Sequence, residues 1–156
     1  MEGHEQYIGQ DIISVDSGLG RVVAVEKMNG TDSEFLVIEY MSDNSRAYYN
    51  IDGNRGFRPI LSKSDFEKSL KEITEFDAKH DFKSKEERIN YFKSEARVED
   101  VNSLLKMLKL MLSFDDLSSA ENFIVNRVQE SLALELATIA QIDPEEAQDL
   151  ILGKVK

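Results

Sequence analysis

The stretch DSGLGRVVAVE, residues 16–26, sets two glycines one residue apart directly before an apolar, β-branched run. Gly18 and Gly20 offer positions at which φ can be positive, and the residues after them have the composition of a strand. We expect a tight turn that leads into a sheet. A phosphate-binding GxGxxG loop would need a glycine in place of Val23 and would continue into a helix. The pattern therefore predicts a structural turn.

From this turn outward, the first 60 residues predict short antiparallel strands separated by Gly-, Asn- and Asp-rich turns. The expected strands cover residues 11–15, 21–28, 34–41 and 46–51. At this length and spacing, such strands are typical of a small, strongly bent β-barrel. From residue 62 onward the apolar period becomes helical. We expect an α+β protein of two domains: a barrel in 1–61 and an all-α bundle of about five helices in 62–156.

Helix start signals in the second part are explicit. Three Ser-x-x-Glu capping boxes and one Asp-Pro pair mark helix N-termini. A further helix is expected over 98–112, where Lys106 and Lys109 would lie at the solvent edge of an otherwise apolar helix. The start signals are Ser64 with Glu67, Ser84 with Glu87, Ser118 with Glu121, and Asp143 with Pro144, and Gly153 is expected just past the end of the last helix.

The amino-acid composition and the net charge limit the classes of function that we expect for this protein. The 156 residues include no Cys, which excludes disulfides and thiolate zinc sites and fits a reducing compartment. We find no secretory leader and no apolar run of about 20 residues, so we expect a cytoplasmic protein without a membrane partner. The net charge of -11 argues against strong unaided binding of nucleic acid. Residues 79–97 are the exception, with six basic against four acidic side chains.

Catalytic and metal-binding patterns are weak. Only His4 and His80 offer imidazole groups. Asp77, His80 and Asp81 could line one side of a metal site, but carboxylates in a polar loop are more often solvated. No carboxylates fall in a pattern that indicates a paired acid and base. We therefore expect no enzyme, no metal and no cofactor. The same polar loop contains Phe82, an aromatic residue with little core to join.

The order of motifs resembles the CarD/CdnL family of bacterial transcription regulators, whose N-terminal module is shared with transcription-repair coupling factors. The resemblance covers residues 7–152 and rests on several short matches in the family's order. These are IGQDII at 8–13, GLGRV at 18–22, EFLVI at 34–38, GFRP at 56–59, LSSAE at 117–121 and LELA at 134–137.

The resemblance implies that the first domain is a Tudor-like barrel that offers a sheet edge to the RNA polymerase β subunit. Strand addition suits such a partner, because main-chain hydrogen bonds provide affinity and neighbouring side chains provide specificity. Two basic family positions fall on Met28 and Tyr48, and Lys27 and Arg46 stand close enough to substitute. The expected polymerase-binding residues are Lys27, Met28, Arg46, Tyr48 and Tyr49.

The resemblance also implies that the helical domain touches promoter DNA at the upstream edge of the transcription bubble, where a family tryptophan wedges into the minor groove and would prolong the open complex. This chain has no Trp, so either Phe82 takes over the wedge or the wedge is missing. The expected DNA-contact residues are Phe82, Lys83, Lys85, Arg88, Lys93 and Arg97. We thus expect a monomeric transcription regulator. The alternative is a protein-interaction adaptor of the same architecture with no DNA role.

Overall fold

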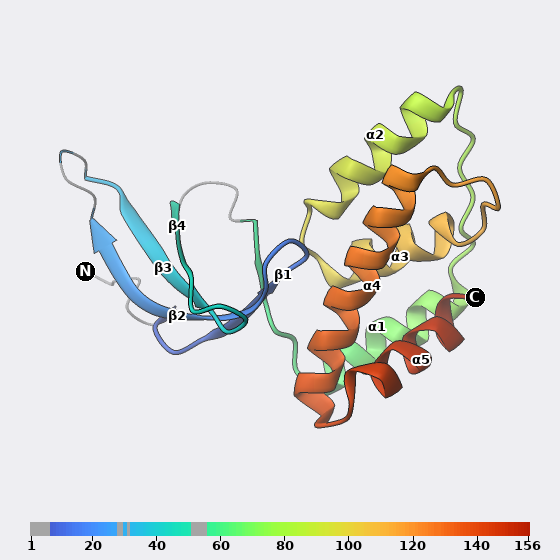
Figure 1. Ribbon diagram of the computed structural model, residues 1–156. Coiled ribbons are helices and arrows are strands. Elements are labelled where there is room, and N and C mark those ends of the chain that lie inside the picture. Colours follow the sequence, from blue (N-terminus) through green and yellow to red (C-terminus); the bar gives the residue numbers. More distant parts are fainter. Residues whose placement is uncertain (1–6, 28–29, 31, 51–55) are drawn as a thin grey trace. The chain divides into compact units, whose positions relative to one another are not determined.

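The computed structural model describes residues 7–27, 30, 32–50 and 56–156, and it contains five strands followed by five helices (Figure 1). This arrangement confirms the expected α+β class, with strands first and a helical part after them. The chain divides into two compact units, Met1–Ile60 and Leu61–Lys156. Whether each unit folds on its own stays a prediction.

The strands form one antiparallel sheet in the order β4-β3-β2-β1-β5. The expectation of a closed barrel is wrong for the described residues, because β4 and β5 are the two edges of an open sheet. The two-residue strand β5 ends at Pro59, which has no N–H, so it offers too few hydrogen bonds to pair with β4 as well as β1. The strands are β1 (Asp11–Ser14), β2 (Gly18–Lys27), β3 (Glu34–Tyr40), β4 (Arg46–Asn50) and β5 (Arg58–Pro59).

The two glycines of the opening stretch have different roles. Gly18 has a φ of 80°, as a tight turn requires, whereas Gly20 pairs with Ile12 and Tyr40 inside the sheet. A Cβ at Gly20 would lie 2.9 Å from Tyr40 Cδ1 and 3.1 Å from the Glu39 carbonyl oxygen. Gly20 is therefore needed for close packing rather than for a positive φ. The core beside it consists of Ile12, Val22, Leu36, Ile38, Tyr40 and Phe57.

The helices are α1 (Lys63–Glu75), α2 (Lys85–Ala96), α3 (Val101–Met111), α4 (Ser119–Ala140) and α5 (Pro144–Val155). The capping box of Ser118 and Glu121 is confirmed, and Ser84 and Asp143 also cap their helices as expected. Helix α1 starts earlier than expected, because the Ser62 hydroxyl rather than that of Ser64 accepts the capping bond, from the N–H of Asp65.

Helix α5 also continues through Gly153, which was expected to follow its end. The buried Val155 lies in this last turn. Burial of Val155 offsets the cost of about 1 kcal/mol for a glycine inside a helix.

Helix α3 is the centre of the helical unit and is buried on most sides, with Leu104, Leu105 and Leu108 fully covered. The sequence predicted that Lys109 lies at the solvent edge of this helix, and this prediction is wrong. The Lys109 Nζ donates to the carbonyl oxygens of Ile73 at 2.7 Å and Phe76 at 2.6 Å, at the end of α1. The last turn of α1 has no basic residue of its own, so Lys109 supplies the cation that favours a helix C-terminus.

Candidate interaction surfaces

Strand β4 is a free edge of the sheet in the part of the chain that the structure describes, with β3 as its strand neighbour there. The N–H of Tyr40 donates to the Ser45 carbonyl oxygen at 2.9 Å, directly before β4. Hydrogen-bonded pairs alternate along antiparallel strands, so the backbone groups of Ala47 face β3 and those of Arg46 and Tyr48 face the open side. A further strand would find main-chain donors and acceptors there.

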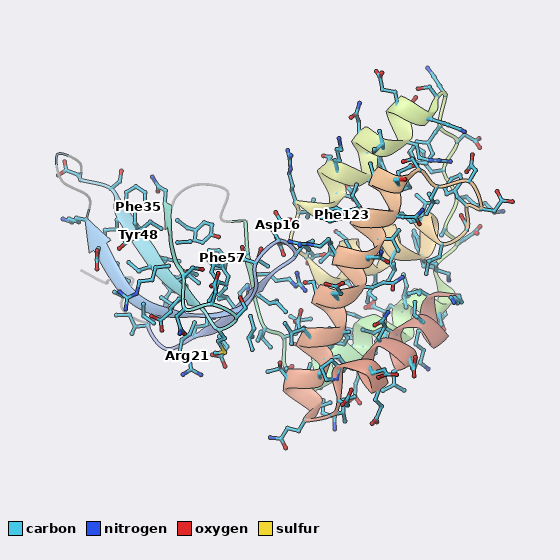
Figure 2. All side chains as sticks on the ribbon, viewed as in Figure 1. Asp16, Arg21, Phe35, Tyr48, Phe57 and Phe123 are labelled. Atoms are coloured by element: carbon cyan, nitrogen blue, oxygen red, sulfur yellow. The ribbon has the colours of Figure 1, made fainter. Side chains whose placement is uncertain are left out.

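Tyr48 and Tyr49 point to opposite faces of β4. The Tyr49 hydroxyl lies 2.7 Å from that of Tyr40, and its ring packs on Phe57 with 5.0 Å between centroids. Tyr49 thus belongs to the core side of the sheet. Tyr48 is 47% exposed and shares its face with Phe35 of the neighbouring strand (Figure 2). Of the two tyrosines, Tyr48 is the exposed one and is the better placed to contact a partner.

A row of alternating charges crosses the same face of the sheet. Asp11, Arg21, Glu39 and Arg46 are aligned on four neighbouring strands. Arg21 Nε lies 2.9 Å from Asp11 Oδ1, and Arg46 Nε lies 3.3 Å from Glu39 Oε2. All four side chains are at least a third exposed, so each pair stabilises the sheet only weakly. Arg46 can exchange its bond to Glu39 for a partner's carboxylate at little cost.

The remaining two expected polymerase contacts lie at the far end of β2. Lys27 is its last residue and is exposed. Met28 lies outside the described residues. In the register, Lys27 pairs with Glu34 at one end of β3, whereas Arg46 pairs with Glu39 toward the other end. The structure therefore brings Arg46 and Tyr48 together on β4 and leaves Lys27 apart from Arg46.

Phe82 does have a core to join, contrary to the expectation from sequence. Its ring stacks on His80 with 4.1 Å between centroids, and it contacts Tyr91, Phe92 and Phe114 at 5.4 to 6.0 Å. These five rings form an aromatic cluster between the loop before α2, helix α2 and the segment after α3. Inserting Phe82 into DNA would require this cluster to open, so its geometry does not favour a wedge.

Arg88 is not a phosphate ligand in this fold, although the sequence placed it among the DNA contacts. Its side chain is only 6% exposed. Nε and Nη2 donate to the two carboxylate oxygens of Glu121 at 2.7 and 2.9 Å, and Nη1 donates to Asp116 Oδ1 at 2.8 Å. The guanidinium also lies 4.8 Å from the centre of the Phe114 ring. All of its charge is therefore used to join α2 to the start of α4.

The arginine changes the acid–base behaviour of its partners. Hydrogen bonds from Arg88 and from the Ser118 N–H hold the pKa of Glu121 at about 2, against 4.5 for the free side chain. The pKa of Asp116 is also lowered, chiefly by its hydrogen bond to Arg88. Glu121 thus completes the cap of α4 and neutralises a buried arginine with the same carboxylate.

The other four expected DNA contacts are exposed. Lys83 and Lys85 flank the start of α2, and Lys85 Nζ lies 3.7 Å from Asp116 Oδ2. Lys93 and Arg97 lie one turn apart at the other end of the helix, on the same side as Glu86. With acidic residues between them, these lysines and Arg97 form a weak basic surface rather than a concentrated patch.

Sequence reasoning missed Phe123, which is the most exposed of the large apolar side chains described. Its side chain on α4 is 63% exposed, and the guanidinium of Arg127 lies 5.5 Å from the ring centre (Figure 2). The helical period did contain the signal. Phe123 lies about half a helical turn away from Val125, Val128 and Leu132, which are buried.

Comparison with known proteins adds no family to these observations: no protein-family model matches the chain, and a search of curated proteins found no match. Within the described ranges, no group of three or more His, Cys, Asp or Glu side chains is placed to hold a metal ion. No helix in this part of the chain is both long and apolar enough to cross a membrane.

Proposed function

We propose that this protein is a transcription regulator that binds the RNA polymerase β subunit by adding the polymerase strand to the free edge of β4. The observation that carries the proposal is the open edge itself, where Tyr48 is exposed and the backbone groups of Arg46 and Tyr48 face outward. The choice of RNA polymerase as the partner rests on the motif order of the sequence, which resembles the CarD/CdnL family. The proposal also includes the relationship of this sheet to Tudor-like domains, which the resemblance implies.

The other edge of the sheet is a poor alternative. Strand β5 has two residues, and Pro59 lacks the N–H that a ladder requires. The edge of β4 provides five residues, with an aromatic anchor and a replaceable arginine beside it. Aromatic and arginine side chains are the residues most often found at the energetic centre of protein interfaces.

Co-purification of polymerase with the full chain tests this proposal. Tyr48→Glu should weaken binding strongly, because a carboxylate would be buried against the partner without a counter-charge. Arg46→Ala should cost about 1 kcal/mol of affinity, as is usual for charges at an interface rim. The matched control is Met41→Glu, which also adds a charge at an exposed apolar residue of this unit but outside β4. Unchanged co-purification with folded Tyr48→Glu protein would refute this docking site.

A second part of the proposal concerns promoter DNA. Lys83, Lys85, Lys93 and Arg97 would contact phosphates, which position a protein without specifying a sequence. We propose Phe123 rather than Phe82 as the apolar side chain that meets the DNA, because Phe123 is exposed and Phe82 is held by four other rings. A contact this weak would act only when polymerase raises the effective concentration to the millimolar range.

Promoter-complex lifetime after a heparin challenge tests the DNA contact. Phe123→Ala should shorten the lifetime while leaving polymerase binding intact. Leu150→Ala removes a similarly exposed apolar side chain from α5 and should leave the lifetime unchanged. If both variants match the wild type, Phe123 has no part in the mechanism.

The alternative function is an adaptor that binds polymerase and makes no DNA contact. It is favoured by the net charge of -11 and by the burial of Arg88, which removes one cation from the expected DNA surface. The adaptor proposal predicts that charge reversal at Lys85 and Lys93 changes neither polymerase binding nor promoter-complex lifetime.

A further inference from the structure

A pocket of about 280 Å³ lies in the helical unit beside the loop that links α1 to α2. We name it the Tyr91 pocket. Helix α2 contributes Tyr91 and Glu95, helix α3 contributes Lys106, and the end of α1 with its following loop contributes Phe76 and His80. Its volume is that of a single small ligand, near the lower end for ligand sites in proteins.

Three aromatic side chains supply flat walls. His80 and Tyr91 lie 4.9 Å apart between ring centroids, and Phe82 supports both rings from the aromatic cluster, at 4.1 and 5.4 Å. Phe76 lines the pocket at the end of α1 and is half-buried. A planar ring that enters the pocket can therefore stack on side chains that are themselves held in place by packing.

Of the polar residues that line the pocket, Lys79 pairs with Asp77 and Ser103 bonds to Asp100, but three others are not used in this way. The Glu95 carboxylate, the Tyr91 hydroxyl and the Lys106 ammonium form no hydrogen bond or ion pair with other described residues. Lys106 contacts the face of Phe76, 5.1 Å from the ring centre. Burial and the charge of Glu95 both raise the pKa of Tyr91, so its hydroxyl keeps its proton and remains a donor. Arg88 and Lys109 of the same unit are instead bound by protein groups.

The charged residues that line the pocket favour some of the ligands that bind to aromatic side chains over others. Quaternary ammonium groups also bind aromatic cages, but Lys79 and Lys106 both line this pocket and would repel a cation. An anionic ligand that also carries N–H donors suits this pocket, because its negative group can contact the lysines and its N–H groups can donate to Glu95. A guanine ring presents two parallel N–H donors on one edge, which match the two oxygens of a carboxylate. Adenine presents a donor beside an acceptor on that edge, so the carboxylate disfavours it.

We propose that the Tyr91 pocket binds a guanine nucleotide, with the base stacked on the aromatic walls, Glu95 accepting from the guanine edge and Lys106 contacting the phosphate. This inference is independent of the proposed polymerase contact, because none of its residues lies in the sheet. The same chemistry is offered by a free nucleotide and by an unpaired guanine in a single strand.

Calorimetric titration of the full chain with GMP and AMP tests the site. GMP should bind with saturation below about 1 mM and at least tenfold more tightly than AMP. Glu95→Gln keeps the shape of the side chain and should abolish this preference. Lys106→Met should weaken both nucleotides alike, because it removes a phosphate contact. Glu130→Gln, on an exposed position of α4, is the matched control and should bind as the wild type does.

Further titrations distinguish a free guanine nucleotide from a guanine in a single strand, and both of them from a quaternary ammonium ligand. Single-stranded oligonucleotides that differ by one guanine or adenine show whether a strand is preferred over free GMP. The proposal is supported if GMP binds more tightly than AMP, or if the oligonucleotide with the guanine binds more tightly than the one with the adenine. Equal binding of GMP and AMP, wild-type binding by Glu95→Gln, or saturation by choline but not by GMP would each overturn it. Circular dichroism of each variant checks that it is folded.

Discussion

Two arginine–glutamate pairs, one in each unit, differ in almost every physical respect except their residue types. Arg46 and Glu39 meet on the face of the sheet at 3.3 Å, and both side chains are more than a third exposed. Arg88 and Glu121 meet in the helical unit through two bonds of 2.7 and 2.9 Å, and their side chains are 6% and 2% exposed. The first pair is available to a partner, and the second is part of the core.

The comparison shows why a basic residue cannot be assigned to a binding surface by its position in the sequence. Arg88 falls in the most basic window of the chain, among lysines that are exposed. It faces inward because it lies one turn before the buried Phe92 on α2, a helix that contacts α4. Burial then makes its charge a structural requirement instead of a binding group.

The largest expected effect comes from breaking the buried pair. Arg88→Met should destabilise the protein by about 3–5 kcal/mol, because it leaves the Glu121 carboxylate buried without its counter-charge. The exposed pair provides the matched control. Arg46→Ala should cost no more than about 1 kcal/mol of stability. Urea unfolding followed by circular dichroism measures both values.

Replacing both partners makes this comparison sharper. The double variant Arg88→Met, Glu121→Met removes both charges and should recover part of the stability lost in Arg88→Met alone. Equal losses in Arg88→Met and Arg46→Ala would contradict the assignment of one pair to the core and the other to the surface.

Acidification should reduce the stability contributed by the buried pair much more than that contributed by the exposed pair. This effect should be somewhat smaller than that of Arg88→Met. The folded pKa of Glu121, about 2, lies below its unfolded value of 4.5. This carboxylate therefore stabilises the fold above pH 4.5, and its contribution is lost as the pH falls toward 2. The total loss should be roughly 3 kcal/mol.

The measurement compares urea unfolding of the wild type and of Glu121→Gln at neutral pH and near pH 2. The stability difference between the two proteins should shrink on acidification. The same comparison with Glu39→Gln should show little change, since that carboxylate is exposed. A constant difference for Glu121→Gln across this range would show that its ionisation does not stabilise the fold.

A third basic residue provides an intermediate case. Lys109 binds backbone carbonyl oxygens at the end of α1, so Lys109→Met should destabilise the protein by about 1.5 kcal/mol. Lys106→Met, one turn earlier on the exposed side of α3, should have little effect on stability. Unfolding midpoints of the two variants test this order, and a greater loss in Lys106→Met would reverse it.

Much of the fold was predictable because its signals are local. The first four strands follow from apolar alternation and turn residues, although β5 was not expected, and the helix starts at Ser84, Ser118 and Asp143 follow from side chains that bond to backbone groups within three residues. That the sheet is open rather than a closed barrel was not predictable, because closing a sheet depends on pairing between strands far apart in the sequence. Of the candidate site residues, Tyr48 and Arg46 remain together on β4, whereas Arg88, Phe82 and Tyr49 are used by the cores.

The sequence by itself determined that strands precede helices, where the helices capped by Ser84, Ser118 and Asp143 begin, and that Gly18 allows a tight turn. It did so because capping, turn chemistry and apolar period act over a few residues. Only the tertiary structure decided which side chains face solvent. The exposure of Phe123, the burial of Arg88 against Glu121 and the reach of Lys109 to α1 each depend on a second element more than 30 residues away in the chain or on the helix phase relative to it. Such long-range packing turns the same residue type into a surface group in one place and a core group in another.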